Sequence, residues 1–234
     1  GSDSPKLDAN VASDADEVKL FESVGVAKYT GNGAITIGQN INAAIHEVTL
    51  WNNWRNWAVA KLSMNQTQSA STDGLIGYWR LDEGHGNVGE DKARSRHLSM
   101  PEGSNWSMEN DNYALSLDGN SYAALDLTKT GSDDDQNYML EFWFRGDKHD
   151  SNATIMHIQK ESPKVDLELV ATPASLNLNV NGETTLVTTD NMMDNAWHHF
   201  SLNVLKGISG MATAYIDGAA KAQIAANKLP AIRT

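Results

Sequence analysis

Acidic side chains gather in two stretches whose composition suits a calcium ion. The stretch LDEGHGNVGED, residues 81–91, contains the carboxylates Asp82, Glu83, Glu90 and Asp91. Ca²⁺ binds about six to eight oxygen ligands, often loop carboxylates and carbonyls. We therefore predict Asp82, Glu83 and Asp91 as metal ligands and calcium as the candidate cofactor. GSDDDQN, residues 131–137, is a second acidic loop, and the alternative for both stretches is an ordinary solvated turn.

One tryptophan in a polar stretch is a candidate for sugar binding. Trp106 follows Asn105 and precedes Asn112 in PEGSNWSMENDN, residues 101–112. Sugar rings stack on exposed aromatic side chains while nearby polar groups bond their hydroxyls. We therefore predict Trp106, Asn105 and Asn112 as ligand-binding residues. The tryptophans in expected strand positions, which we assign to the core, are Trp51, Trp79, Trp143 and Trp197.

Two patterns that occur in enzymes have simpler interpretations here. Asp166 and Glu168 share one face of an expected strand, and glycoside hydrolysis uses a pair of carboxylates. The same alternation also describes an ordinary strand with one solvated face. His198 and His199 are neighbours in a strand and therefore point to opposite faces, which disfavours a shared metal ion. We expect no catalytic residues and no enzymatic activity.

Most of the chain consists of short segments with strand character, separated by turn signals such as Asn-Gly and Asp-Gly. The segments are 33–38, 43–51, 113–119, 138–146, 153–159, 165–172, 175–180, 183–189, 197–205 and 211–218. Within 43–51, the period-two alternation places His46 and Glu47 on opposite faces. Many short strands at this spacing indicate an antiparallel β-sandwich.

One segment, residues 53–64, has the spacing of a helix instead. Asn52 or Asn53 is a suitable N-cap. The side chains that share its apolar face are Trp54, Trp57, Ala58 and Leu62. We expect this face to pack on the sheet.

Five stretches resemble motifs of laminin-G-like domains of the concanavalin A-like lectin class. They are AWHHFSLNVLKGISGMATAYIDG (196–218), ALSLDGNSYAALD (114–126), YMLEFWFRG (138–146), GAITIGQNINAAIHEVTLWN (33–52) and GLIGYWRLDEGHG (74–86). The resemblance implies an all-β, antiparallel jelly-roll sandwich, here with one short helix. His46 stands where the family usually has aspartate, and residues 89–100 lack its serine-, glycine- and asparagine-rich turn. Both departures weaken the transfer of a calcium site.

The order of the motifs implies that the chain runs from the end of one repeat into the body of the next. We expect a polar lead-in at 1–17, the closing strands and helix of a preceding repeat at 18–64, a linker at 65–74, and at 75–234 the body of a domain that lacks its own closing strands. Residues 33–51 would fill the missing place, because an unfilled gap exposes sheet edges. The alternative is a strand-swapped dimer, in which each chain completes its neighbour.

Composition narrows the classes of partner. A formal net charge of -12 argues against nucleic acid, and the sequence has no apolar run of about 18 residues that would insert into a membrane. The absence of cysteine excludes disulfides and thiolate metal sites. With the resemblance, these features favour a non-catalytic module that binds a glycan or an extracellular protein, in a secreted or cell-surface bacterial multi-domain protein. The alternatives are a spacer repeat without a ligand and a domain associated with a glycoside hydrolase.

Overall fold

The computed structural model describes most of the chain. The described residues are 18–19, 33–39, 41–94, 98–99, 105–109, 111–119, 123–127, 137–161 and 164–229. The expected lead-in at 1–17 and most of the second acidic loop, 131–136, lie outside them. Within the described part, no helix has the length and apolar composition needed to cross a bilayer.

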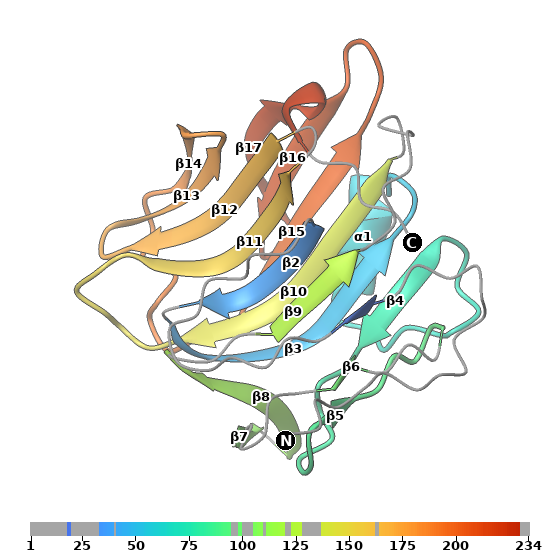
Figure 1. Cartoon of the computed structure of the whole chain (residues 1–234), viewed down its shortest axis with the longest axis vertical. Coiled ribbons are helices and arrows are strands. Elements are labelled where there is room, and N and C mark those ends of the chain that lie inside the picture. Colours follow the sequence, from blue (N-terminus) through green and yellow to red (C-terminus); the bar gives the residue numbers. More distant parts are fainter. Residues whose placement is uncertain are drawn as a thin grey trace.

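The described residues form an all-β sandwich of two antiparallel sheets with one short helix (Figure 1), which confirms the expected fold class. The first sheet has the order β1 (Val18–Lys19), β9 (Ala123–Leu127), β2 (Gly33–Gln39), β11 (Ala153–Glu161), β12 (Lys164–Thr172), β13 (Ser175–Val180), β14 (Glu183–Thr188). The second has the order β17 (Ala219–Ala225), β16 (Met211–Ile216), β15 (His198–Leu205), β10 (Tyr138–Gly146), β3 (Asn42–Trp51), β8 (Asn112–Asp118), β7 (Asn105–Glu109), with β4 (Leu75–Trp79) also paired to β3. The remaining elements are the ladder of β5 (Val88–Gly89) and β6 (Leu98–Ser99), helix α1 (Trp57–Ser63) and a 3-10 turn (Ala226–Lys228).

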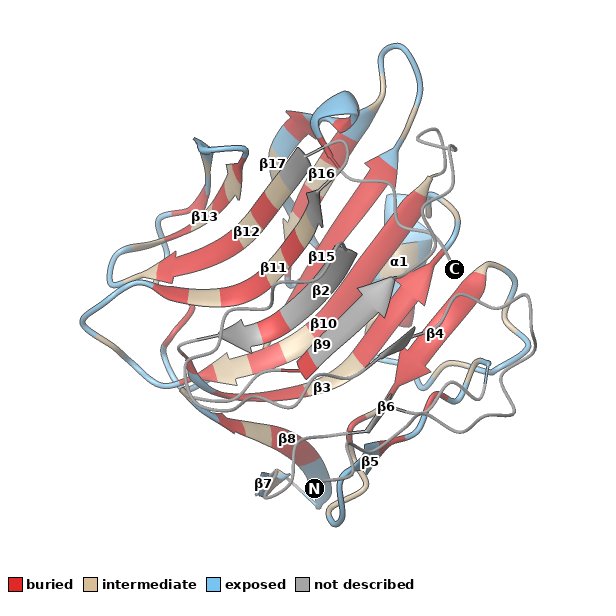
Figure 2. Cartoon of the chain, in the orientation of Figure 1, coloured by how far each residue is buried: buried red, intermediate tan, exposed pale blue. Residues whose placement is uncertain are grey.

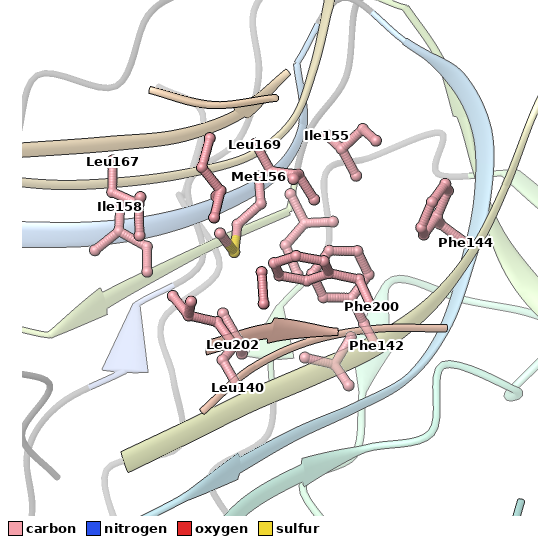
Figure 3. Packing of buried hydrophobic residues seen from close by; sticks show 14 of the residues in the cluster. Leu140, Phe142, Phe144, Ile155, Met156, Ile158, Leu167, Leu169, Phe200 and Leu202 are labelled. Atoms are coloured by element: carbon pink, nitrogen blue, oxygen red, sulfur yellow. The ribbon is translucent and has the colours of Figure 1, made fainter. Parts of the chain in front are cut away.

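The core lies between the two sheets and is built from alternate residues of their strands. Figure 3 shows the cluster, to which β10 contributes Leu140, Phe142 and Phe144, β15 Phe200 and Leu202, β11 Ile155, Met156 and Ile158, and β12 Leu167 and Leu169. Full burial of one such side chain contributes about 1.5–3 kcal/mol. Figure 2 shows that buried residues run along the central strands, whereas exposed residues concentrate in the turns. The intervening side chains of β10 therefore face away from this core.

Strands β2 and β3 are inner strands of the first and the second sheet, and their neighbours belong to the same chain. Strand β2 pairs with β9 on one side and β11 on the other. Strand β3 lies between β10 and β8 in the same way. The earliest long strands of the chain thus join strands that follow much later in the sequence (Figure 1).

A β-bulge in β3 changes which side chains face the core. His46 pairs with Trp143 and Thr49 with Glu141, so two residues of β3 lie opposite one residue of β10. Glu47 has a φ of 54°, which re-aims the strand. The core residues accordingly change from Ile45 to Val48, and His46 and Glu47 both reach the outer face. The prediction that these two side chains lie on opposite faces is wrong, because it assumed an unbroken alternation.

Helix α1 begins later than predicted and does not bury its aromatic face. Its N-cap is Asn56, whose side chain accepts a hydrogen bond from the Ala58 N–H, rather than Asn52 or Asn53. All four members of the predicted buried face are exposed: Trp54, Trp57, Ala58 and Leu62. The buried residue of the helix is Ser63. The Trp57 indole instead donates to the Gly218 carbonyl at 3.0 Å, which holds the ring at the surface.

The position of β3 within its own chain is testable with a disulfide. Ala44 and Ser116 are partners across β3 and β8, and the chain has no cysteine of its own. We expect the double variant A44C/S116C to form an intramolecular disulfide, because paired strand residues lie within the Cα separation that a disulfide bridges. The oxidised protein should run as a monomer on a non-reducing gel.

The two single-cysteine variants serve as controls and should also remain monomeric. A disulfide-linked dimer that forms in the double variant after refolding, and in neither control, would identify the strand-swapped arrangement instead.

Candidate ligand-binding pocket

The outer face of the second sheet, which points away from the core, carries polar and aromatic side chains. On β10 these are Met139, Glu141, Trp143 and Arg145, which alternate with the core residues. The segment between β3 and β4, residues 52–74, covers one part of this face and is called the covering segment below. Beneath it lies a small buried cluster of Trp51, Leu75, Tyr78 and Met139, against which Ala60 of α1 packs.

Glu141 is a buried carboxyl under the covering segment. Its Oε2 accepts hydrogen bonds from Thr49 Oγ1 at 3.0 Å and from Trp51 Nε1 at 2.8 Å. Burial raises the pKa of Glu141, and the two bonds together with the nearby Arg55 only partly oppose this shift. The nearest approach of His199 to the other carboxyl oxygen is 3.6 Å. This carboxyl therefore ties β3 to β10 from inside rather than facing solvent.

Arg55 fastens the covering segment to the sheet. Its backbone N–H donates to Asn203 Oδ1 at 3.2 Å, and its carbonyl accepts from Asn203 Nδ2 at 2.6 Å. The guanidinium lies 3.7 Å from the centre of the Trp51 ring and donates to Ser63 Oγ at 3.1 Å. The segment before and within α1 is thereby fixed relative to β15 and β3.

A pocket of about 320 Å³ opens beside the covering segment. The bulge supplies His46 and Glu47, and the residues after β4 supply Arg80 and Asp82. The other walls come from Asn112 and Tyr113 of β8, Trp143, Trp197 and residues 64–67. The volume is at the lower end of the range of ligand sites, about 300–1,000 Å³.

The aromatic rings of the pocket are held in place by their neighbours. Trp143 Nε1 donates to the Met64 carbonyl at 3.1 Å. The His46 ring lies nearly parallel to Trp143, with centroids 6.3 Å apart, and meets the Trp197 ring edge to face at 4.5 Å. Arg145 lies 5.8 Å from the Trp197 ring centre. These contacts pack the rings of the wall against one another.

One guanidinium serves both carboxylates of the pocket. Arg80 Nε donates to Glu47 Oε1 at 3.2 Å, and Arg80 Nη2 pairs with Asp82 Oδ2 at 2.8 Å. The Tyr78 hydroxyl donates to the other oxygen of Glu47. Burial and this bond raise the pKa of Tyr78. Both oxygens of Glu47 are therefore used, whereas no hydrogen bond among the described residues occupies Oδ1 of Asp82.

Two histidines on this face are held neutral. Burial lowers the pKa of His46 to about 4, although Asp82 opposes the shift. Burial also lowers the pKa of His199 to about 4. A neutral imidazole has one donor and one acceptor nitrogen, so His46 offers the pocket both functions near pH 7.

The predicted sugar-binding residues do not form one site. Trp106 is half-buried, packs against the core and donates to the Gly86 carbonyl at 3.1 Å. Asn105 pairs with Ser116, and Asn112 pairs with Glu109, so the two asparagines lie at opposite ends of the β7–β8 ladder. Asn112 lines the pocket, and the structure does not bring Trp106 and Asn105 to it.

The structure does not gather the three predicted calcium ligands. Asp82 is paired with Arg80, and Glu83 Oε1 accepts the Glu90 N–H at 2.8 Å. Asp91 is 2 % exposed and its Oδ1 accepts two backbone N–H groups, from Tyr78 at 3.0 Å and Ala93 at 2.9 Å. Among the described residues, these carboxylates are not part of a cluster of ion-binding size. Asp91 stabilises the turn after β4 instead.

A separate cluster lies on the other sheet. His157 Nε2 is 2.6 Å from Asp166 Oδ1, and the ligand atoms of these residues and Glu168 lie within 4.8 Å of one another. Leu167, between Asp166 and Glu168, and Leu169, directly after Glu168, are both buried, as the alternation predicted. This cluster belongs to the outer face of the first sheet and contributes nothing to the pocket.

The sequence interpretation missed the two tryptophans of the pocket. We assigned Trp143 and Trp197 to the core because they lie in or beside strands, yet both are half-buried on the outer face. The alternation in YMLEFWFRG already contains the signal: Trp143 is in phase with Glu141, and Phe142 is in phase with the core.

Comparison with known proteins adds no relative to these observations. The sequence matches no protein-family model, and neither a curated protein nor a solved structure is significantly similar to the chain.

Because Asn203 attaches the covering segment to the sheet, we expect N203A to lower the free energy of unfolding strongly. The substitution removes both bonds to the Arg55 main chain, and each buried polar group left unpaired costs about 1–3 kcal/mol. We expect the free energy of unfolding, measured with urea, to fall by about 2–4 kcal/mol. The control N179A removes one exposed bond to Thr184 on the first sheet and should change it by less than about 0.5 kcal/mol. Equal losses would contradict the role of Asn203.

The histidines predict distinct titrations by NMR. His46 and His199 should remain neutral until the pH approaches about 4, whereas the bond to Asp217 raises the pKa of His198. Because the two folded pKa values lie below the unfolded value of about 6.5, the folded state binds fewer protons between these limits. Their contribution to stability is complete above pH 6.5 and falls as the pH drops toward 4. Protonation of His46 near pH 6.5 would show that its ring is solvated.

Proposed function

We propose that the protein is a non-catalytic carbohydrate-binding module and that the pocket beside the β3 bulge holds the sugar. The observation that carries the proposal is the composition of this pocket. Trp143, Trp197 and Tyr113 offer apolar ring surface, while Asp82 and Asn112 offer hydrogen-bonding groups. A sugar ring presents apolar C–H faces and a rim of hydroxyls, which such a combination recognises.

The rigidity of the pocket supports binding. Its tryptophan and histidine rings are packed on one another, and the wall at residues 64–67 is bonded to Trp143 through Met64. The Gln68 amide further bonds the Ser63 and Gln66 carbonyls. A site that is ordered before binding loses less conformational entropy when the ligand arrives.

The charges of the pocket favour binding over glycoside hydrolysis. A hydrolase needs one carboxyl protonated as an acid and a second one ionised. Glu47 and Asp82 both pair with the guanidinium of Arg80, an arrangement that does not set one carboxyl apart from the other as an acid. Glu141 has the raised pKa of an acid, but Thr49 and Trp51 enclose it.

The resemblance to laminin-G-like domains supports the same proposal, and on it we also propose that the module belongs to a secreted or cell-surface bacterial protein. An extracellular protein is the second candidate ligand, and the exposed apolar side chains of Trp54, Trp57 and Leu62 favour it, because such patches mark interaction surfaces. A spacer without any ligand is the remaining alternative.

A glycan array with variants of two tryptophans tests the proposal. We expect the wild type to bind glycans reproducibly and W197A to lose at least about tenfold in affinity, since removal of one stacking ring costs on the order of 1.5 kcal/mol. W106F is the matched control, because Trp106 lies outside the pocket, and it should bind as the wild type does.

Three results would contradict this proposal. Binding lost in W106F and kept in W197A would move the site to β7. No binding to any glycan favours a spacer or a protein ligand. Turnover of a polysaccharide by the wild type would show an enzyme.

A further inference from the structure

We propose that the pocket selects an uncharged mono- or disaccharide over acidic sugars, and that Asp82 is the residue that sets this preference by accepting hydrogen bonds from neighbouring hydroxyls. The inference rests on the proposed function and names the class of sugar. Four features of the same pocket carry it: its charge, the engagement of its one guanidinium, the free oxygen of Asp82 and its size.

The pocket is negatively charged overall. Glu47 and Asp82 contribute two carboxylates, Arg80 contributes one guanidinium, and His46 is neutral near pH 7. The nearest further cation on β10, Arg145, is paired with Glu109 at 2.7 Å. The chain as a whole carries a formal net charge of -12. A uronic, sialylated or sulfated sugar would therefore enter a site of its own sign.

The one cation that the described residues contribute to the pocket, Arg80, is already engaged. Recognition of a carboxylate or sulfate by arginine uses two parallel N–H donors. Arg80 directs Nε to Glu47 and Nη2 to Asp82. An acidic sugar would have to displace one of these internal carboxylates, which would then lose its partner in a partly buried position. The internal ion pairs thus exclude the anion that arginine otherwise attracts.

Asp82 is the carboxylate best placed to bind hydroxyls. Its Oδ2 pairs with Arg80, while no hydrogen bond within the described part of the chain occupies its Oδ1. Its side chain is 24 % exposed, so it is accessible yet held in position. An ionised carboxylate is acceptor-only and forms strong bonds with O–H donors. Neighbouring hydroxyls of a sugar provide two such donors.

The remaining walls suit a small neutral ring. Tyr113 and Trp197 offer apolar surface, the Asn112 amide and neutral His46 each donate and accept, and the cavity measures about 320 Å³. This volume lies near the minimum for ligand sites and corresponds to a mono- or disaccharide rather than a long chain. The Asn112 amide and the neutral His46 ring can both bond sugar hydroxyls, and neither requires a charged substituent on the sugar.

The first experiment uses the wild-type protein alone. Calorimetry compares glucose, galactose and mannose with glucuronic and galacturonic acid, and an array compares neutral glycans with sialylated and sulfated ones. We expect binding to at least one neutral sugar that changes little with added salt, because no net charge is brought into the site. Strongest binding to acidic glycans would overturn the inference while leaving the proposed function in place. Absence of all glycan binding would overturn the proposed function itself.

The second experiment changes the charge of the pocket. D82N removes the ionised acceptor and releases one arm of Arg80, so we expect at least about tenfold weaker binding of the neutral sugar and a gain of binding to the matching uronic acid. D150N is the control, because Asp150 is exposed in the turn after β10, and it should leave both affinities unchanged. Unchanged neutral-sugar affinity in a folded D82N protein would contradict the role of Asp82.

Discussion

The two-for-one pairing at the bulge of β3 is the constraint on which the pocket depends. A regular strand would turn either His46 or Glu47 into the core, where an unpaired carboxylate is costly. The positive φ of Glu47 instead presents both side chains outward while Ile45 and Val48 remain inside. A single local irregularity thus supplies the imidazole between the tryptophans and the carboxylate that positions Arg80.

The covering segment converts an open sheet face into a bounded cavity. It is held less by apolar packing than by main-chain bonds to Asn203 and by the stacking of Arg55 on Trp51. The buried carboxyl of Glu141 bonds the same indole from below. The Asn203 amide, the Trp51 indole and one oxygen of Glu141 are thus hydrogen-bonded, and the bonds of Asn203 hold the covering segment on the sheet.

The fold class could be predicted from the sequence, because the alternation, the turn residues and the strand lengths all indicate an antiparallel β-sandwich. The pocket could be predicted only in part, because no local pattern reports the proximity of its residues. They come from 46–47, 64–67, 80, 82, 112–113, 143 and 197. The sequence indicates both Asp82 and Asn112 as functional residues, but it assigns Asp82 to a metal site and Asn112 to a sugar site with Trp106. The face of Trp143 follows from its phase with Phe142. The bulge at Glu47 leaves a weaker sign, because the adjacent polar residues His46 and Glu47 shift the apolar alternation from Ile45 to Val48 and Leu50.

The central position of β2 and β3 has a consequence for how the chain is made. These strands are made well before their partners: β10 follows β3 about 90–100 residues later, and β11 follows β2 about 115–125 residues later (Figure 1). Ile45, Val48 and Leu50 are therefore without their final neighbours during much of synthesis. Pairings of such long range make folding slow and leave apolar strands exposed to association. Side chains that are buried in the finished sheets are thus exposed for much of the time in which the protein is being made.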